Sequence, residues 1–437
     1  MQLKKINITN VNALQLFQLI RYGTFLLIGI LLSKSDLGKT DIGRYETFLL
    51  IAGAFTFFWV NGFLKVMMPS VSEKEENKKR ILVFNTFFLL LIFSALAAIL
   101  MLLLNQPFST FLLNGNEILM PMLLALYILI NSPAMMIEYI YLINNQSKRI
   151  LIYAIITFTL QLAAVGIPPF LGFGLNTIIA GLFGVSVLRF LWLMGVLGKY
   201  AKWELQWPIL KEYMILGAPL VLSTLLSSSA RYIDGFIITS QFSPDDFAIF
   251  QYGARELPLA MLLANSLSMA MLPQLSKKNI ESPLAEFRSE IYRLNWLLFP
   301  VSILLLLTSH WFYPLVFSPE FAPSATIFNI YLLLVISRVL FPQTLLIARK
   351  MNRIIVSASF FEIIINVGLS IILAKTMGMM GVAYATFVAY LFEKVYLIIA
   401  CKKKLNISLS NYLPLQLYIT MSSVLVLVFI FVEFFLN

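Results

Sequence analysis

Charged residues are scarce in this chain of 437 residues, because Asp, Glu, Lys and Arg together make up 12% of it, against roughly 25% in a soluble globular protein. The single cysteine, Cys401, and the single histidine, His310, exclude an intramolecular disulfide framework and a Cys/His zinc site. Gly and Pro, at 20 and 18, are too few for a low-complexity chain. Apolar residues make up 60%, and the mean hydropathy is +0.87. The composition therefore indicates a membrane protein.

Long apolar runs predict an all-α polytopic membrane protein. A run of about 20 apolar residues crosses the hydrocarbon core as a helix. Thirteen such runs are found, at residues 12–33, 43–64, 81–104, 118–142, 150–171, 175–197, 213–240, 247–272, 294–316, 324–347, 354–375, 380–401 and 414–436. The first is predicted to be a retained span, because it is too long for a signal peptide and lacks a small-residue cleavage site. Residues 281–296 have an amphipathic pattern and are predicted to lie as a helix on the cytoplasmic interface.

The net charge of +11 is spread over short loops, which argues against a nucleic-acid-binding face. With the N-terminus in the cytoplasm, 22 of the 32 basic residues fall in inside segments and three in outside segments. Lys and Arg collect in this way on the cytoplasmic side of membrane proteins. We therefore predict a cytoplasmic N-terminus and, with thirteen spans, a C-terminus on the outer side.

The two halves of the sequence resemble one another at a constant offset of 204 residues. MMPSVS at residues 67–72 matches MLPQLS at 271–276, and the same shift relates Asp41 to Asp245, Arg149 to Arg353 and Gly174 to Gly378. Because the repeat contains six spans, the halves should be related by a pseudo-twofold axis along the membrane normal. We predict a six-helix bundle at 1–198, a cytoplasmic linker at 199–211, a second six-helix bundle at 212–401, and a basic loop with a peripheral thirteenth helix at 402–437.

Four arginines in the leading spans of the two halves are the candidate substrate site: Arg21, Arg44, Arg231 and Arg255. A charge at the bilayer centre costs at least ~2.5–3.5 kcal/mol and marks a functional candidate. Because Arg stays charged and binds phosphate oxygens bidentately, the set is predicted to hold a diphosphate, and the substrate to be anionic. The alternatives are an intrahelical ion pair with Asp234 for Arg231 and interfacial anchoring for Arg44.

Three acidic residues are candidates for coupling transport to protons or sodium: Glu362, Asp234 and Glu256. Glu362 lies deep in its span with no basic neighbour in sequence, only Asn366 one turn on. The alternative is a core carboxyl hydrogen-bonded to another helix. Five further embedded charges are interpreted as structural: Glu138, Arg189, Arg338, Glu393 and Lys394. No catalytic residue, metal ligand or cofactor is predicted.

Three segments resemble the multidrug/oligosaccharidyl-lipid/polysaccharide (MOP) exporter superfamily, and within it the Wzx-type flippases for undecaprenyl-diphosphate-linked oligosaccharides. They are LKEYMILGAPLVLSTLLSSSARYIDGFIITSQFSPDDFAIFQYGARELP (Leu210 to Pro258), MLPQLS, and the N-terminal hairpin ending in MMPSVS. The resemblance covers residues 10–401. It implies a V-shaped pair of six-helix bundles that opens alternately to each face. In related lipid II flippases, arginines in similar helices hold the diphosphate, which implies this role for Arg21, Arg44 and Arg255.

The implied function is a flippase, and no enzyme activity is expected. It would move a lipid-linked oligosaccharide from the cytoplasmic to the outer leaflet of a bacterial inner membrane, for a surface polysaccharide such as O-antigen. Its partners would be the polyprenyl-diphosphate-linked oligosaccharide, membrane lipid and the polysaccharide polymerase machinery, without nucleic acid. One alternative is a MATE-like ion-coupled multidrug exporter, which would favour acidic and aromatic groups for organic cations. The other is a polysaccharide polymerase or glycosyltransferase, against which the short outside segments argue.

Overall fold

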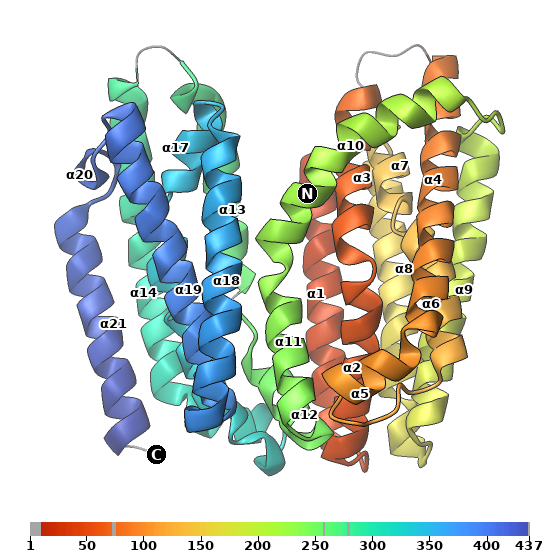
Figure 1. Ribbon diagram of the computed structural model, residues 1–437, viewed down its shortest axis with the longest axis horizontal. Helices are drawn as coiled ribbons and strands as arrows, with labels where there is room; N and C mark the ends of the chain where they lie inside the picture. The colour runs from red at the N-terminus through yellow and green to blue at the C-terminus, as the bar shows by residue number, and fades with distance from the viewer. Residues whose placement is uncertain (1–9, 72–75, 257, 278–279, 436–437) are drawn as a thin grey trace, which may run out of the picture. The chain divides into compact units, whose positions relative to one another are not determined.

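The chain folds into helices joined by short loops in a computed structural model that describes residues 10–71, 76–256, 258–277 and 280–435. The positions of Lys4, Lys5, Lys74 and Lys278, used above for the topology, lie outside these ranges. The first helices are α1 Asn10–Lys34, α2 Lys39–Ala54, α3 Phe57–Val71, α4 Glu76–Leu103, α5 Asn105–Leu112, α6 Pro121–Ala134, α7 Ile137–Ile143, α8 Ser147–Gly166, the short η1 Pro168–Leu171, α9 Leu175–Tyr200 and α10 Trp207–Ser228 (Figure 1).

The helices continue without a strand in the described part of the chain. They are α11 Ala230–Gln241, α12 Pro244–Gly253, α13 Pro258–Leu275, α14 Glu281–Val316, η2 Pro319–Phe321, α15 Ser324–Leu332, α16 Val335–Arg338, α17 Pro342–Ala348, α18 Asn352–Met377, α19 Met379–Ala400, η3 Cys401–Leu405, α20 Leu409–Tyr412 and α21 Leu415–Phe435. The predicted all-α polytopic membrane fold is confirmed.

The number of spans differs from the predicted thirteen. Among the described residues, ten helices are long and apolar enough to cross a membrane, or up to 12 if two bent helix pairs each count as one span. The predicted span at 247–272 is not among them, because it divides into α12 and the short apolar helix α13. The interruption falls at Arg255 and Glu256, so two adjacent charges stand where the helix is broken.

The two bent pairs have local causes. α2 and α3 meet at an angle of 49°, where the Thr56 hydroxyl donates to the Ala52 carbonyl at 2.7 Å; such bonds back to the preceding turn often bend helices. The segments Ser324–Arg338 and Pro342–Ala348 meet at 43°, and Pro342 removes a backbone donor at that break. Both breaks lie inside predicted spans, at 43–64 and 324–347, each of which the sequence analysis treated as a single helix.

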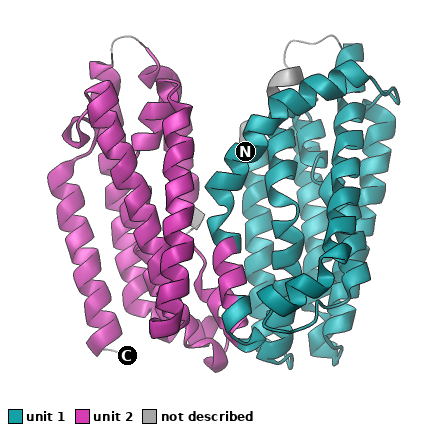
Figure 2. Ribbon diagram, in the orientation of Figure 1, with its two compact units in different colours: residues 1–232, 239–245 teal, residues 233–238, 246–437 magenta. Residues whose placement is uncertain are grey.

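The helices group into two compact units (Figure 2). Unit 1 contains residues 1–232 and 239–245, and unit 2 contains residues 233–238 and 246–437. Within unit 1, α10 packs closely along α3, α1 along α8, and α4 along α6. We predicted residues 212–401 as the second bundle, whereas packing places residues 212–232 with unit 1. The predicted bundle boundaries rest on the sequence repeat, which packing does not test, so they stay a prediction.

The segment between α9 and α10 is fixed to α4. The Arg80 guanidinium donates to the Ala201 carbonyl at 3.2 Å. The Asn85 side chain donates to the Glu204 carbonyl at 2.9 Å and accepts from the Gln206 backbone N–H at 3.0 Å. Hydrogen bonds from Lys202 and Gln206 hold the pKa of the exposed Glu204 carboxyl below its usual value. The middle of the predicted linker, residues 201–206, is therefore an ordered segment bound to α4 of unit 1.

The predicted interfacial helix at 281–296 is corrected by the structure. These residues form the first part of α14, a continuous helix of 36 residues. At ~1.5 Å per residue, it is longer than the hydrocarbon core is thick. The apolar stripe packs on protein, since Phe287 is fully buried and its ring lies 5.4 Å from that of Phe341. The amphipathic pattern thus marks a helix extension with one protein-facing side.

The predicted thirteenth span corresponds to α21, which packs along α14 within unit 2. Its Glu433 carboxylate accepts from Asn329 of α15 at 2.5 Å and lies 3.2 Å from the His310 ring nitrogen of α14. These contacts fasten α21 to two helices of its unit through polar groups.

Candidate functional site

Arg255 lies on aromatic rings at the break between α12 and α13. Its guanidinium carbon is 4.7 Å from the centre of the Tyr252 ring and 5.9 Å from that of Phe317. The Tyr252 ring also stacks on Phe321 at 4.8 Å. A cation over ring faces is held by the quadrupole of the rings while its N–H groups stay available. Phe317 follows the last residue of α14, so Arg255 lies near the level of that helix end.

The neighbouring Glu256 is neutralised by another residue. Arg338, the last residue of α16, donates to its carboxylate through two nitrogens at 3.0 and 2.6 Å. The Arg338 guanidinium also lies 4.8 Å from the Tyr390 ring centre. This bidentate pair joins two helix breaks within unit 2. Because Glu256 is occupied, it does not cancel the charge of Arg255.

We expect Arg338→Ala to destabilise the protein by about 3 kcal/mol, since breaking a buried pair leaves an uncompensated charge. The two side chains are only 23% and 19% exposed. Thermal unfolding of the purified protein in detergent checks this. The double variant Arg338→Ala/Glu256→Ala should recover part of the loss, and a double variant that is as unstable as the two single losses combined would contradict the pairing.

Arg21 lies on α1, within unit 1. It interacts electrostatically with Glu138 of α7, a side chain that is only 3% exposed. Arg189 of α9 belongs to the same surroundings, donating to Gln161 at 2.6 Å and lying 5.0 Å from the Phe158 ring centre. No ion pair within 4 Å joins Arg21 to Glu138 in the described part of the chain. Arg21 is therefore partly balanced but not fixed by a carboxylate.

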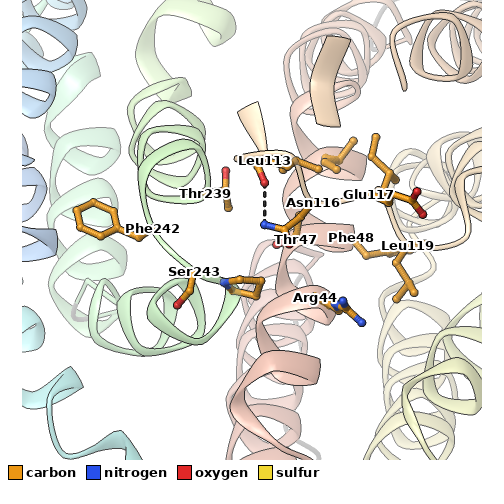
Figure 3. A pocket seen from close by; sticks show the side chains of 13 residues that line it. Arg44, Thr47, Phe48, Leu113, Asn116, Glu117, Leu119, Thr239, Phe242 and Ser243 are labelled. Carbon is orange, nitrogen blue, oxygen red and sulfur yellow. Dashed lines mark hydrogen bonds between the residues drawn. The ribbon is translucent and has the colours of Figure 1, made fainter. Parts of the chain in front are cut away.

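Arg44 is exposed and lines a small pocket of unit 1, on which α2, the α5–α6 loop and the α11–α12 loop converge. Figure 3 shows Arg44 across the pocket from Phe242, with Glu117 also in the lining. Thr239 donates to the Leu112 carbonyl at 2.8 Å and fastens the end of α11 there. This pocket combines one basic and one acidic residue near helix ends, and the interfacial alternative for Arg44 stays a prediction.

Arg231 is exposed at the start of α11, and Asp234 has partners on other helices. The Asp234 Oδ2 accepts from Thr386 of α19 at 2.7 Å and from Tyr331 of α15 at 3.1 Å. No Arg231–Asp234 ion pair is present among the described residues. The intrahelical pair considered from the sequence is thus wrong, because the Asp234 carboxylate is bound by Thr386 and Tyr331 instead.

A buried group of oxygen atoms surrounds Asp234, and we call Asp234, Asn366 and Thr386 the acceptor pocket. The Asn366 amide donates to Thr386 at 3.0 Å. Asp234 Oδ1 and Asn366 Oδ1 have no hydrogen-bond partner in the described part of the chain. All three side chains are at most 3% exposed. Buried acceptors without donors are costly, and they are suited to a cation or a proton.

Glu362 stands on the same face of α18 as Asn366, one turn away, followed by Ser370 another turn on. The Glu362 side chain is 4% exposed, and its Oε1 has no partner among the described residues. Its carboxyl interacts electrostatically with Asp234, Arg338, Glu393 and Lys394. Glu393 and Lys394 form a buried pair at 2.8 Å. The three predicted coupling residues thus belong to one polar region of unit 2.

The four candidate arginines, unlike the three coupling candidates, do not belong to one polar region of a single unit. Arg21, Arg44 and Arg231 belong to unit 1 and Arg255 to unit 2, and each has the separate surroundings described above. The sequence interpretation gives Arg338 a structural role but does not identify its partner Glu256. It also does not single out Lys65, one of the 22 basic residues counted in the inside segments, which lies within α3. Among the described residues, no three or more His, Cys, Asp or Glu side chains converge as for a metal ion.

The model of a family described as "Polysaccharide biosynthesis protein" matches residues 31–326. No curated protein sequence matches the chain. A structure of the lipid II flippase MurJ in an inward closed conformation is similar with a TM-score of 0.70 and 18% identity, over 96% of this chain and 92% of that one.

Multidrug transporters have a similar fold as well. An inward-facing MATE family transporter of the MOP superfamily gives a TM-score of 0.64 and 14% identity, over 91% of this chain and 98% of that one. A MOP superfamily transporter from Pyrococcus furiosus, described as having reversed polarity in its binding pocket, gives 0.55 and 14%, over 90% and 94%. These likenesses show the MOP fold.

Proposed function

Because the chain belongs to the family described as polysaccharide biosynthesis protein, we propose that it is a flippase for a lipid-linked oligosaccharide used in a surface polysaccharide. The headgroup of this substrate is a diphosphate carrying a sugar chain on a polyprenyl tail. The protein would carry it from the cytoplasmic to the outer leaflet of a bacterial inner membrane by alternating access.

One observation carries the proposal: in the described part of the chain, Arg255 has no carboxylate within 4 Å, although it lies between two helices of an apolar bundle. Its neighbour Glu256 is already paired with Arg338, and its own guanidinium lies on aromatic rings. An arginine held in this way can direct its N–H groups to phosphate oxygens. Arg21 would add a second cation from unit 1, and Arg44 and Arg231 are assigned weaker, peripheral contacts because both are exposed.

The acceptor pocket is assigned to coupling. A monovalent cation or a proton taken up at Asp234 would satisfy the free oxygens of Asp234 and Asn366, and Glu362 is the neighbouring carboxyl. In transporters, ion sites formed by helices near the bilayer midplane link ion movement to substrate movement. The driving ion would be the second transported species.

A multidrug exporter is the second candidate, favoured by the similarity to MATE transporters. Organic cations need accessible carboxylates and free ring faces. Here Arg255 lies over Tyr252 and Arg338 pairs with Glu256, and the carboxylates of Asp234 and Glu362 are at most 4% exposed. The enzymatic alternative has less support, since the similar structures described above are those of flippases and transporters.

A deletion strain tests the proposal. Loss of the protein should stop surface polysaccharide and leave the lipid-linked oligosaccharide facing the cytoplasm, with drug resistance unchanged. Unpolymerised units accumulating on the outer leaflet would indicate a polymerase, and increased drug sensitivity with normal polysaccharide would indicate a multidrug exporter. Either result would contradict the flippase.

A further inference from the structure

Lys65 is an intramembrane cation that the sequence pattern conceals. The apolar run of its span ends at residue 64, but α3 continues to Val71. Lys65 therefore lies six residues inside a helix, and its side chain is exposed on unit 1. At ~1.5 Å per residue, that is ~9 Å from the end of α3.

The side chain points back along its helix. α3 and α10 lie in close contact at Gly62, where an added Cβ would lie 2.7 Å from the Val221 Cα. Lys65 is one turn after Gly62, toward the predicted cytoplasmic end of α3, yet its ammonium donates to Thr224 at 3.3 Å. Thr224 is one turn beyond Val221, further from the cytoplasmic start of α10. Because helical side chains tilt toward the N-terminus, the ammonium is directed into the membrane and not toward cytoplasmic headgroups.

The ammonium has no acidic counterpart. No carboxylate lies within 4 Å of it in the described part of the chain, and its partner Thr224 is a neutral hydroxyl that is 4% exposed. A lysine carries three donors, and one hydrogen bond leaves two of them for a ligand. Unpaired cations in membrane segments are costly and face a cavity or a substrate path.

We propose that Lys65 binds a phosphate of the lipid-linked substrate, as a point charge in addition to the arginines. Lysine is an established type of phosphate ligand, and the Thr224 hydroxyl positions its ammonium. The proposal rests on the proposed flippase function, and it adds a residue of α3 to the substrate path.

Binding to the full-length protein in nanodiscs tests the proposal, with undecaprenyl diphosphate as probe and uncharged undecaprenol as its control. Lys65→Gln should weaken the affinity for undecaprenyl diphosphate about tenfold, as loss of a charge-assisted hydrogen bond does, and leave undecaprenol binding unchanged. Lys65→Arg should keep most of the affinity. Lys211→Gln, an exposed lysine on the first turns of α10, is the matched control and should bind as the wild type does.

Thr224→Val separates binding from a structural role, because it removes the tie between α3 and α10 but keeps the charge. It should retain affinity within about threefold, since only a neutral hydrogen bond is lost. Wild-type affinity in Lys65→Gln, or an equal loss in Thr224→Val, would overturn the role of Lys65 alone. A wild-type protein that does not distinguish the diphosphate from undecaprenol would overturn the flippase as well.

Discussion

An Arg21→Ala/Arg255→Ala double variant should lose at least about 100-fold in the rate of lipid-linked oligosaccharide flipping, at normal protein abundance. Each hydrogen bond to a charged group contributes roughly 1.5–3 kcal/mol, and every 1.4 kcal/mol is a factor of ten. On the proposed function, the double variant would therefore lack both of the main proposed contacts to the diphosphate. Surface polysaccharide and the transport rate in vesicles measure the effect.

The control for this variant is Arg293→Ala. Arg293 is exposed and paired with Glu290 at 2.8 Å on the first part of α14, and surface pairs of this kind contribute little. It should leave export unchanged. Charge-preserving Arg21→Lys/Arg255→Lys should recover activity only partly, because lysine cannot bind phosphate bidentately. Full export by the double alanine variant would show that these arginines do not hold the substrate.

An Asp234→Asn variant should lose the dependence of transport on an ion gradient. The substitution keeps the shape of the side chain and an acceptor for Thr386 and Tyr331, but it removes the negative charge of the acceptor pocket. A neutral pocket has no electrostatic reason to take up a cation or to release a proton. Where a sodium or proton gradient stimulates the wild type several-fold, the variant should show about the same rate with and without the gradient.

Glu290→Gln, on the exposed part of α14, is a carboxyl-to-amide control and should keep the gradient response. Glu362→Gln tests whether the neighbouring carboxyl takes part in coupling: a loss of gradient response in both variants indicates a shared polar region. An Asp234→Asn protein that responds to the gradient like the wild type would remove the acceptor pocket from coupling.

Much of the fold could be predicted from the sequence, because hydrocarbon thickness and apolar run length are directly related. The helix breaks were harder, since the length of an apolar run places a span but not a bend within it. Thr56 lies at one break, and Arg338 and Pro342 lie at the other. The break beside Arg255 carried a signal in its two adjacent charges, but a window average hides it. Residues 281–296 were placed at the interface because periodicity shows that one side is apolar and not whether lipid or protein covers it.

The polar partners in unit 2 could not be predicted from sequence spacing. Glu256 and Arg338 are 82 residues apart, and Asp234 and Thr386 are 152 apart, so only the packing of helices within unit 2 brings each pair together. For Asp234 the nearby Arg231 suggested a local pair, and its actual partners lie on other helices. Lys65 was missed for a different reason. It directly follows the last residue of an apolar run, so a span defined by that run ends before it, although α3 continues to Val71.

The most direct test of the central claim is transport by the purified protein in liposomes containing a fluorescent undecaprenyl-diphosphate oligosaccharide, with a membrane-impermeant reagent reporting the exposed leaflet. We expect the wild type to move the labelled lipid across the bilayer, and the Arg21→Ala/Arg255→Ala protein to leave it where it was inserted. Equal movement by both proteins, or movement of a neutral undecaprenyl glycoside at the same rate, would contradict recognition of the diphosphate by embedded arginines.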